Sequence, residues 1–183
     1  EFSPKRDAFL IPVGYYLKDG KKTLLYLDLS ISTQCHVLIG GTSGYGKTNI
    51  VKSILATIVT NYSYQDVNLI ISDLKGSELP AFANTKHCVK YTDSPTETVT
   101  IVKELLVEMK NRYSLFLSSK CKDISGYNAK GFKLPRIVFM IDEFADLTLL
   151  ADSGDIDSTV ISDLTRLLQK GRSAGIHCIS SVQ

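Results

Sequence analysis

The chain has 183 residues, of which 44% are hydrophobic and 22% are charged, and its formal net charge is +2. These values are typical of an ordinary globular domain with a substantial core, and they exclude a disordered or fibrous chain. The small net charge neither requires nor excludes a nucleic-acid partner, so any basic surface has to be local.

The cysteine spacing and the hydropathy of the sequence exclude further classes of protein. The four cysteines lie far apart and form no Cys-x-x-Cys pair, which argues against a zinc site and against a disulfide scaffold. Reduced thiols of this kind are typical of cytoplasmic proteins, and we expect that location. No apolar run approaches the ~20 residues of a membrane span, and we identify no secretory signal.

The first predicted element is a β-hairpin. Residues 13–17 and 23–27 are apolar and aromatic runs, and Asp19-Gly20 lies between them. An Asp-Gly pair between two such runs favours a tight two-residue turn. We expect residues 1–34 to form an N-terminal hairpin extension that supplies an antiparallel edge to the sheet that follows.

Residues 41–48 fit the phosphate-loop pattern G-x-x-x-x-G-K-[ST] without a mismatch. The apolar run at 36–39 predicts a strand before the loop, and apolar residues at helical spacing across 50–59 predict a helix after it. In this context, backbone N–H groups and the positive end of the helix dipole cradle phosphate oxygens. The alternative is a glycine-rich loop that matches the pattern by chance.

The residues of this loop have different expected roles. Lys47 contributes a point charge at the β- and γ-phosphates, and the Thr48 hydroxyl binds Mg²⁺. The glycines allow the backbone to turn its N–H groups inward. The predicted nucleotide-binding residues of the loop are Gly41, Thr42, Ser43, Gly44, Tyr45, Gly46, Lys47, Thr48 and Asn49.

Further elements are predicted after the phosphate-loop helix. Residues 67–72 form a buried strand that closes on Asp73, and residues 87–91 form a short strand. Ser94, Pro95 and Glu97 form a helix start with a capping box, and apolar residues at helical spacing continue that helix to about residue 117. The polar segment 120–134 predicts a loop.

The most apolar strand, residues 137–141, ends in Asp142 and Glu143. A carboxylate at this position holds Mg²⁺ in the Walker B arrangement, and we assign that role to Asp142. Glu143 is then placed to orient a water molecule for attack on the γ-phosphorus, which favours ATP hydrolysis over a kinase or switch GTPase. The alternative is that both carboxylates only cap the next helix.

A second long helix is predicted over 156–174, followed by a last strand over 176–182. Gln183 ends that strand and is expected to contact the γ-phosphate, although a frayed terminus without a role is equally consistent.

Arg172 lies between Gly171 and Gly175, which we expect to mark the helix end. It is a candidate arginine finger that acts on a neighbouring subunit, with Arg166 as the competitor. The alternative is a surface cation that the helix dipole favours.

Strands that alternate with helices predict an α/β fold with a mainly parallel sheet and helices on both faces. Ligands of such sheets bind at the carboxyl ends of the strands. The phosphate loop, Asp73, Asp142 and Gln183 all follow predicted strands at that edge.

Several segments together resemble the FtsK/SpoIIIE family of DNA-translocating ATPases. Most specific are the Asp-Glu-Phe-Ala-Asp string at 142–146 and the Lys-Gly-Arg-Ser-Ala-Gly-Ile-His string at 170–177, in that order. Two positions depart from the family's usual residues: Tyr45 stands in place of serine, and Leu74 in place of proline. Neither departure involves Lys47, Thr48, Asp142 or Glu143, so hydrolysis is still expected. The other matching segments are 11–14, 36–48, 71–79, 108–113, 134–141 and 167–169.

The resemblance implies a RecA-like P-loop motor core over residues 1–183 that is incomplete at its C-terminus, because the family's core continues with further strands. It implies ATP and Mg²⁺ as cofactors and a hexameric ring around double-stranded DNA, with ATP at the subunit interfaces. Chromosome partitioning and conjugative transfer are the implied processes. The alternative is an ATPase module of type VII protein secretion. The full-length protein is expected in the cytoplasm or anchored at the inner face of the membrane.

Overall fold

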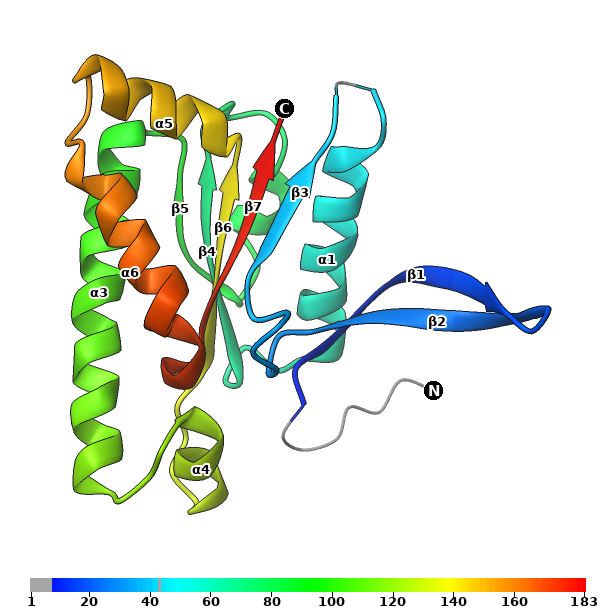
Figure 1. The fold of residues 1–183 in the computed structure, drawn as a ribbon, viewed down its shortest axis with the longest axis vertical. Coiled ribbons are helices and arrows are strands. Elements are labelled where there is room, and N and C mark those ends of the chain that lie inside the picture. The colour runs from blue at the N-terminus through cyan, green and yellow to red at the C-terminus, as the bar shows by residue number, and fades with distance from the viewer. Residues whose placement is uncertain (1–7, 43) are drawn as a thin grey trace.

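A parallel five-stranded sheet forms the centre of the computed structural model, which describes residues 8–42 and 44–183 (Figure 1). The strand order is β3-β7-β6-β4-β5, and every neighbouring pair is parallel. The strands are β3 (Val37–Gly40), β4 (Val67–Asp73), β5 (Cys88–Thr92), β6 (Arg136–Asp142) and β7 (Ile176–Val182).

Helices cover both faces of the sheet, as the sequence predicts (Figure 1). Helix α1 lies on one face, and α3, α5 and α6 lie on the other. The helices are α1 (Lys47–Asn61), α2 (Pro80–Ala83), α3 (Pro95–Ser118), α4 (Ile124–Ala129), α5 (Phe144–Ser153) and α6 (Thr159–Ala174). Within the described part of the chain, no helix is long and apolar enough to cross a membrane.

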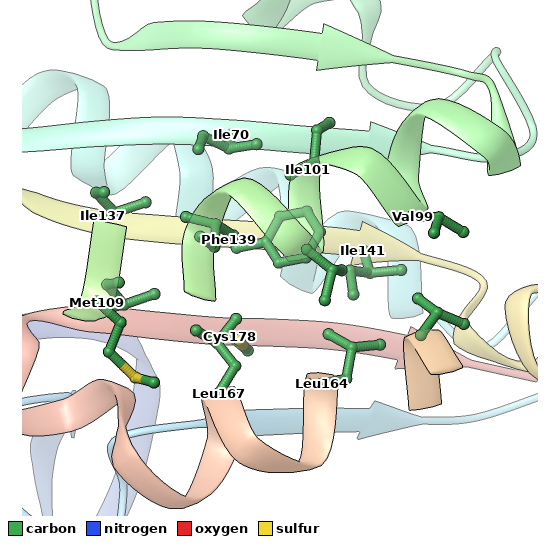
Figure 2. Close-up of a cluster of buried hydrophobic side chains, with 14 of the residues drawn as sticks. Ile70, Val99, Ile101, Met109, Ile137, Phe139, Ile141, Leu164, Leu167 and Cys178 are labelled. Atoms are coloured by element: carbon green, nitrogen blue, oxygen red, sulfur yellow. The ribbon is translucent and has the colours of Figure 1, made fainter. Parts of the chain in front are cut away.

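The hydrophobic core has two parts, one on each face of the sheet, because alternate residues of each central strand point to opposite faces. In β6, Ile137, Phe139 and Ile141 pack toward α3 and α6, where Figure 2 shows them beside Leu164 and Leu167. The intervening strand residues pack toward α1, whose Val51, Ile54, Leu55 and Ile58 are buried. Burial on both faces explains why these strands read as continuous apolar runs.

The predicted hairpin is confirmed, but its predicted place in the main sheet is wrong. Strands β1 (Leu10–Lys18) and β2 (Lys21–Asp28) form a separate antiparallel sheet that projects from the body (Figure 1). The base of the hairpin packs with the α1 side of the core, through the buried Ile11 and Leu29. A hydrogen bond of 2.7 Å from the Tyr62 hydroxyl to the Leu10 carbonyl also holds it there. These contacts keep the hairpin over α1 rather than beside β3.

The segment after α3 also differs from the prediction. Residues 120–134 were expected to form a loop, but they contain α4. The Asp123 side chain caps this helix by accepting a hydrogen bond of 2.9 Å from the Gly126 N–H, and Ile124 is buried against the core. One capping residue and one buried side chain are too weak a pattern to identify such a short helix from sequence.

Two predictions about helix ends, the capping box of α3 and the end of α6, are only partly correct. Ser94 caps α3 by accepting from the Glu97 N–H at 3.3 Å, but the Glu97 carboxylate accepts instead from the Thr92 hydroxyl at 2.7 Å, so the reciprocal bond of a capping box is not formed. Gly175 ends α6 in the left-handed conformation. Gly171 lies inside the helix, where a Cβ atom would approach the Ile176 carbonyl oxygen to 2.7 Å. It is required for close packing, not for termination.

A buried histidine makes stability dependent on pH. The His177 ring accepts from the Arg136 guanidinium at 3.4 Å through Nε2, while Nδ1 donates to the Cys35 carbonyl at 3.1 Å. Burial and the nearby Arg136 charge lower the pKa of His177 from 6.5 to about 3. The neutral ring is therefore the form that fits this site.

We expect acid to destabilise the chain partly through His177. The unfolded chain binds this proton near pH 6.5 and the folded chain only near pH 3, so stability present above pH 6.5 is lost as the pH falls toward 3. His177→Gln should flatten the pH dependence of the free energy of unfolding by up to about 1.4 kcal/mol per pH unit. Urea unfolding between pH 7 and pH 4 measures this effect, and equal slopes for the two chains would contradict it.

Candidate nucleotide-binding site

The phosphate loop joins β3 to α1 in the arrangement that the sequence predicts. Gly44 and Gly46 have φ of 83° and 87°, a left-handed conformation that favours glycine. Gly46 is also the N-cap residue of α1, and no side chain caps this helix end. The first N–H groups of α1 are therefore not occupied by a capping side chain, as an anion site requires. Ser43 lies outside the described residues.

A pocket of about 320 Å³ opens at this loop. It includes most of the predicted loop residues, together with Glu78 and Gln183 from two other parts of the chain. Gly41 and Tyr45 do not line it, and the Tyr45 side chain is 85% exposed on the rim. The lining residues are Thr42, Gly44, Gly46, Lys47, Thr48, Asn49, Glu78 and Gln183.

Lys47 and Glu143 meet at the base of the site. Their Nζ and Oε2 atoms are 3.3 Å apart, and their side chains are only 7% and 5% exposed. The phosphate-loop lysine and the second Walker B carboxylate thus form one buried ion pair across 96 residues of sequence. In the described structure, the Glu143 carboxylate is the anion that neutralises Lys47.

Glu143 is fixed from three further directions. Its Oε2 atom accepts from Lys75 Nζ at 2.8 Å, its Oε1 atom accepts from the Gln183 N–H at 3.0 Å, and its own N–H donates to the Ser181 hydroxyl at 3.3 Å. These contacts hold it in a left-handed conformation with φ of 60°, which is strained for a residue other than glycine. Such a strained position persists only where its surroundings determine it, as they do here.

Opposing effects set the charge of this carboxylate. Burial raises the pKa of Glu143, but hydrogen bonds from Lys75, the Gln183 N–H and Lys47 outweigh burial and hold the pKa below its ordinary value of 4.5. The same hydrogen bond to Glu143 raises the pKa of Lys75. Both groups are therefore charged at neutral pH.

Asp142 is held beside Glu143 by the last strand. The Ser181 hydroxyl of β7 hydrogen-bonds the Asp142 carboxylate and also receives the Glu143 N–H. The alternative that these carboxylates cap the next helix is wrong, because α5 begins at Phe144 without a hydrogen bond from a capping side chain. The two acids are oriented toward the phosphate loop and β7 instead.

The structure brings most predicted site residues together but leaves one apart. The Gln183 backbone is anchored on Glu143, and the residue lines the pocket, which argues against a frayed terminus. Arg172 is exposed in the last turn of α6, just before the seven-residue strand β7, so roughly 20 Å separates it from the pocket edge. Its side chain cannot reach the pocket of its own chain. Arg166 pairs with Asp163 on the same helix, at 3.3 Å.

Sequence reasoning missed two residues of the site, Lys75 and Ser181. The polar residue Ser181 follows the apolar part of β7, one residue beyond the Ile141–Ser180 register pair, so it lies at the carboxyl edge like Asp142. Lys75 follows Asp73, which is the register partner of Asp142 in the adjacent strand. The signal for both was their position at strand ends, but it did not say which carboxylate they contact.

The residues present fit a magnesium nucleoside triphosphate. The glycine-rich turn, the helix end without a side-chain cap and the buried Lys47 suit phosphate oxygens, and Thr48 and Asp142 supply the oxygen ligands that Mg²⁺ prefers. Glu143 lies on the same side, ionised and fixed. The arrangement has the parts needed to bind phosphate and to polarise a water molecule.

The chain is similar in sequence to known proteins of one family. The sequence model of the FtsK/SpoIIIE family matches residues 5–135 and 129–183. The chain is 33% identical over 192 residues to DNA translocase FtsK of Streptococcus pneumoniae, covering 98% of this chain and 24% of the relative. It is 33% identical over 160 residues to DNA translocase SpoIIIE of Bacillus subtilis, covering 81% of this chain and 20% of the relative. The chain thus spans less than a quarter of these relatives.

Solved structures share the fold. The monomer form of the pCW3 conjugation coupling protein TcpA with ATPγS has a TM-score of 0.72 at 25% identity, covering 99% of this chain and 49% of that one. ATPases 2 and 3 of EssC from Geobacillus thermodenitrificans have a TM-score of 0.82 at 21% identity, covering 100% of this chain and 35% of that one. With the family match over nearly its whole length, the chain belongs to the FtsK/SpoIIIE family.

Proposed function

We propose that this chain is the ATP-hydrolysing unit of a ring that moves double-stranded DNA, in chromosome partitioning or in conjugative transfer. The observation that carries the proposal is the buried contact of Lys47 with Glu143, which places the phosphate-binding cation and the water-orienting base in one site. The translocase relatives that match by sequence support DNA as the cargo. The motor would act in the cytoplasm, with any membrane anchor supplied by the full-length protein.

Each residue of the site has a separate role in the proposed hydrolysis. Thr48 and Asp142 would hold Mg²⁺, which neutralises charge on the phosphates when it is bound. Lys47 exchanges its contact with Glu143 for the β- and γ-phosphates. Glu143 orients a water molecule in line with the γ-phosphorus and accepts its proton, while Ser181 keeps both carboxylates in place. Gln183 lies at the pocket edge, where its side chain would contact the γ-phosphate.

Arg172 would complete the site from a neighbouring subunit. Its exposed position at the amino edge of the sheet, out of reach of its own pocket, supports this proposal. A homo-oligomeric ring, which we propose to be hexameric, would bring this edge of one subunit to the pocket of the next.

A second candidate function is export of proteins in type VII secretion. The fold is shared with a type VII secretion ATPase, EccC of Thermomonospora curvata, solved in complex with a signal sequence peptide, with a TM-score of 0.70 at 24% identity. This likeness concerns the fold, whereas the more similar sequences are DNA translocases. We therefore favour DNA and treat peptide recognition as an outcome of the test below.

Lys47→Ala should weaken nucleotide binding. A hydrogen bond between charged groups contributes about 1.5–3 kcal/mol, so the affinity for a fluorescent ATP analogue should fall by roughly ten- to 100-fold. Lys103→Ala is a suitable control, because that lysine pairs with Asp157 on the protein surface, at 2.6 Å. Unchanged affinity in the Lys47 variant would refute the phosphate-loop assignment.

DNA should bind and stimulate the assembled full-length protein. Because phosphate contacts release counterions, affinity for duplex DNA should drop steeply between 50 and 200 mM salt, by about 10³-fold or more for six or more contacts. Glu143→Gln should keep DNA and ATP binding but slow turnover by about 10²–10⁴-fold. If a signal-sequence peptide raises ATPase activity and DNA neither binds nor stimulates, the protein is a secretion ATPase instead.

Arg172→Ala should inactivate assemblies, with turnover falling by about 10³-fold or more. Mixing its subunits with Lys47→Ala subunits creates some interfaces in which the arginine and the phosphate loop are both intact. Partial recovery of ATPase activity in the mixture is expected. Complete absence of recovery, or an equal loss with Arg166→Ala alone, would count against Arg172 as the residue that acts between subunits.

A further inference from the structure

The loop between β4 and α2 is built around the buried side chain of Asp73. Its Oδ2 atom accepts from the N–H groups of Glu78 at 3.1 Å and Leu79 at 2.9 Å, and from the Tyr91 hydroxyl at 2.9 Å. The Gly76 N–H also donates to the Asp73 carbonyl, at 2.7 Å. Four hydrogen bonds therefore fix the path of residues 73–79.

This loop presents Lys75 to the catalytic carboxylate. Lys75 Nζ is 2.8 Å from Glu143 Oε2, which is closer than the 3.3 Å between Lys47 and the same oxygen. The Lys75 side chain is 34% exposed and that of Glu143 only 5%, so the lysine reaches from a partly exposed position to a buried carboxylate. Neither the family strings nor the phosphate-loop motif assigns a role to this contact.

We propose that Lys75 is a positioning residue that holds Glu143 in place for the attacking water. The inference rests on the ATPase function proposed above. Both lysines contact one carboxylate oxygen, and only Lys47 belongs to the phosphate loop. When Lys47 turns to the phosphates, Lys75 remains as the cation that neutralises and orients the buried carboxylate. Without it, the hydrogen bond from the Gln183 N–H is the carboxylate contact that remains among the described residues, while the Glu143 N–H keeps its bond to Ser181.

A double-mutant cycle in the nucleotide-free chain tests the contact itself. The variants are Lys75→Met, Glu143→Gln and the pair, compared by urea unfolding midpoints. We expect clear non-additivity, with Lys75→Met shifting the midpoint much less when Glu143 is already glutamine. The matched control pair is Lys90 with Glu104, where the distance is 3.0 Å and the lysine is 31% exposed. Additive effects at Lys75 and Glu143 would overturn the proposal.

Steady-state kinetics of the full-length assembly test the role. Lys75→Met should lower kcat by about 10²-fold and leave affinity for a non-hydrolysable ATP analogue within about twofold, because the loss falls on water orientation. Lys75→Arg should recover much of kcat, and Lys90→Met should leave both values unchanged. An unchanged kcat in Lys75→Met, or an equal loss of affinity, would overturn the proposal. An inactive parent assembly would instead refute the ATPase function, and the unfolding cycle would still decide the contact.

Discussion

The candidate site is organised around one buried carboxylate, that of Glu143. A buried charge without partners costs several kcal/mol, so the fold has to supply cations and N–H donors around it. Three separate elements do so: the start of α1 with Lys47, the β4–α2 loop with Lys75, and the end of β7 with Gln183. A parallel sheet brings the carboxyl ends of its strands to one edge, and the strand order β3-β7-β6-β4 places these elements near one another.

That constraint also explains the buried position of Lys47. Lys47 is 7% exposed and needs an anion, and Glu143 supplies it. In the proposed mechanism, a triphosphate that enters the pocket competes for the same cation, so binding is an exchange of one anion for another. The exchange leaves Glu143 close to the phosphate that replaces it, where a base is useful. Phosphate recognition and placement of the base are therefore parts of a single ion-pair rearrangement.

Features that depend on short sequence separation were predictable. The phosphate loop, the Asp19-Gly20 turn and the apolar strand before Asp142 are each specified within about ten residues by backbone conformation and burial. Features that depend on the register between distant strands were not predictable from the sequence. The contact of Lys75 with Glu143 spans 68 residues, and no local pattern states which strand tips will be adjacent. The prediction of where the hairpin lies was wrong for the same reason, since its position against α1 depends on tertiary packing.

The position of Arg172 favours a role between subunits, as proposed above. One strand, β7, separates this arginine from Gln183 and the pocket, and a strand cannot fold back on itself to close that gap. Beside the pocket of one chain lie Lys47 and Thr48 from the phosphate-loop side, Lys75 from the β4–α2 loop, and the carboxylates of Asp142 and Glu143 at the tip of β6. In the function proposed above, a further cation for the transition-state charge comes from a neighbouring subunit. If it does, hydrolysis requires contact between subunits, and a ring gives every pocket the same neighbour.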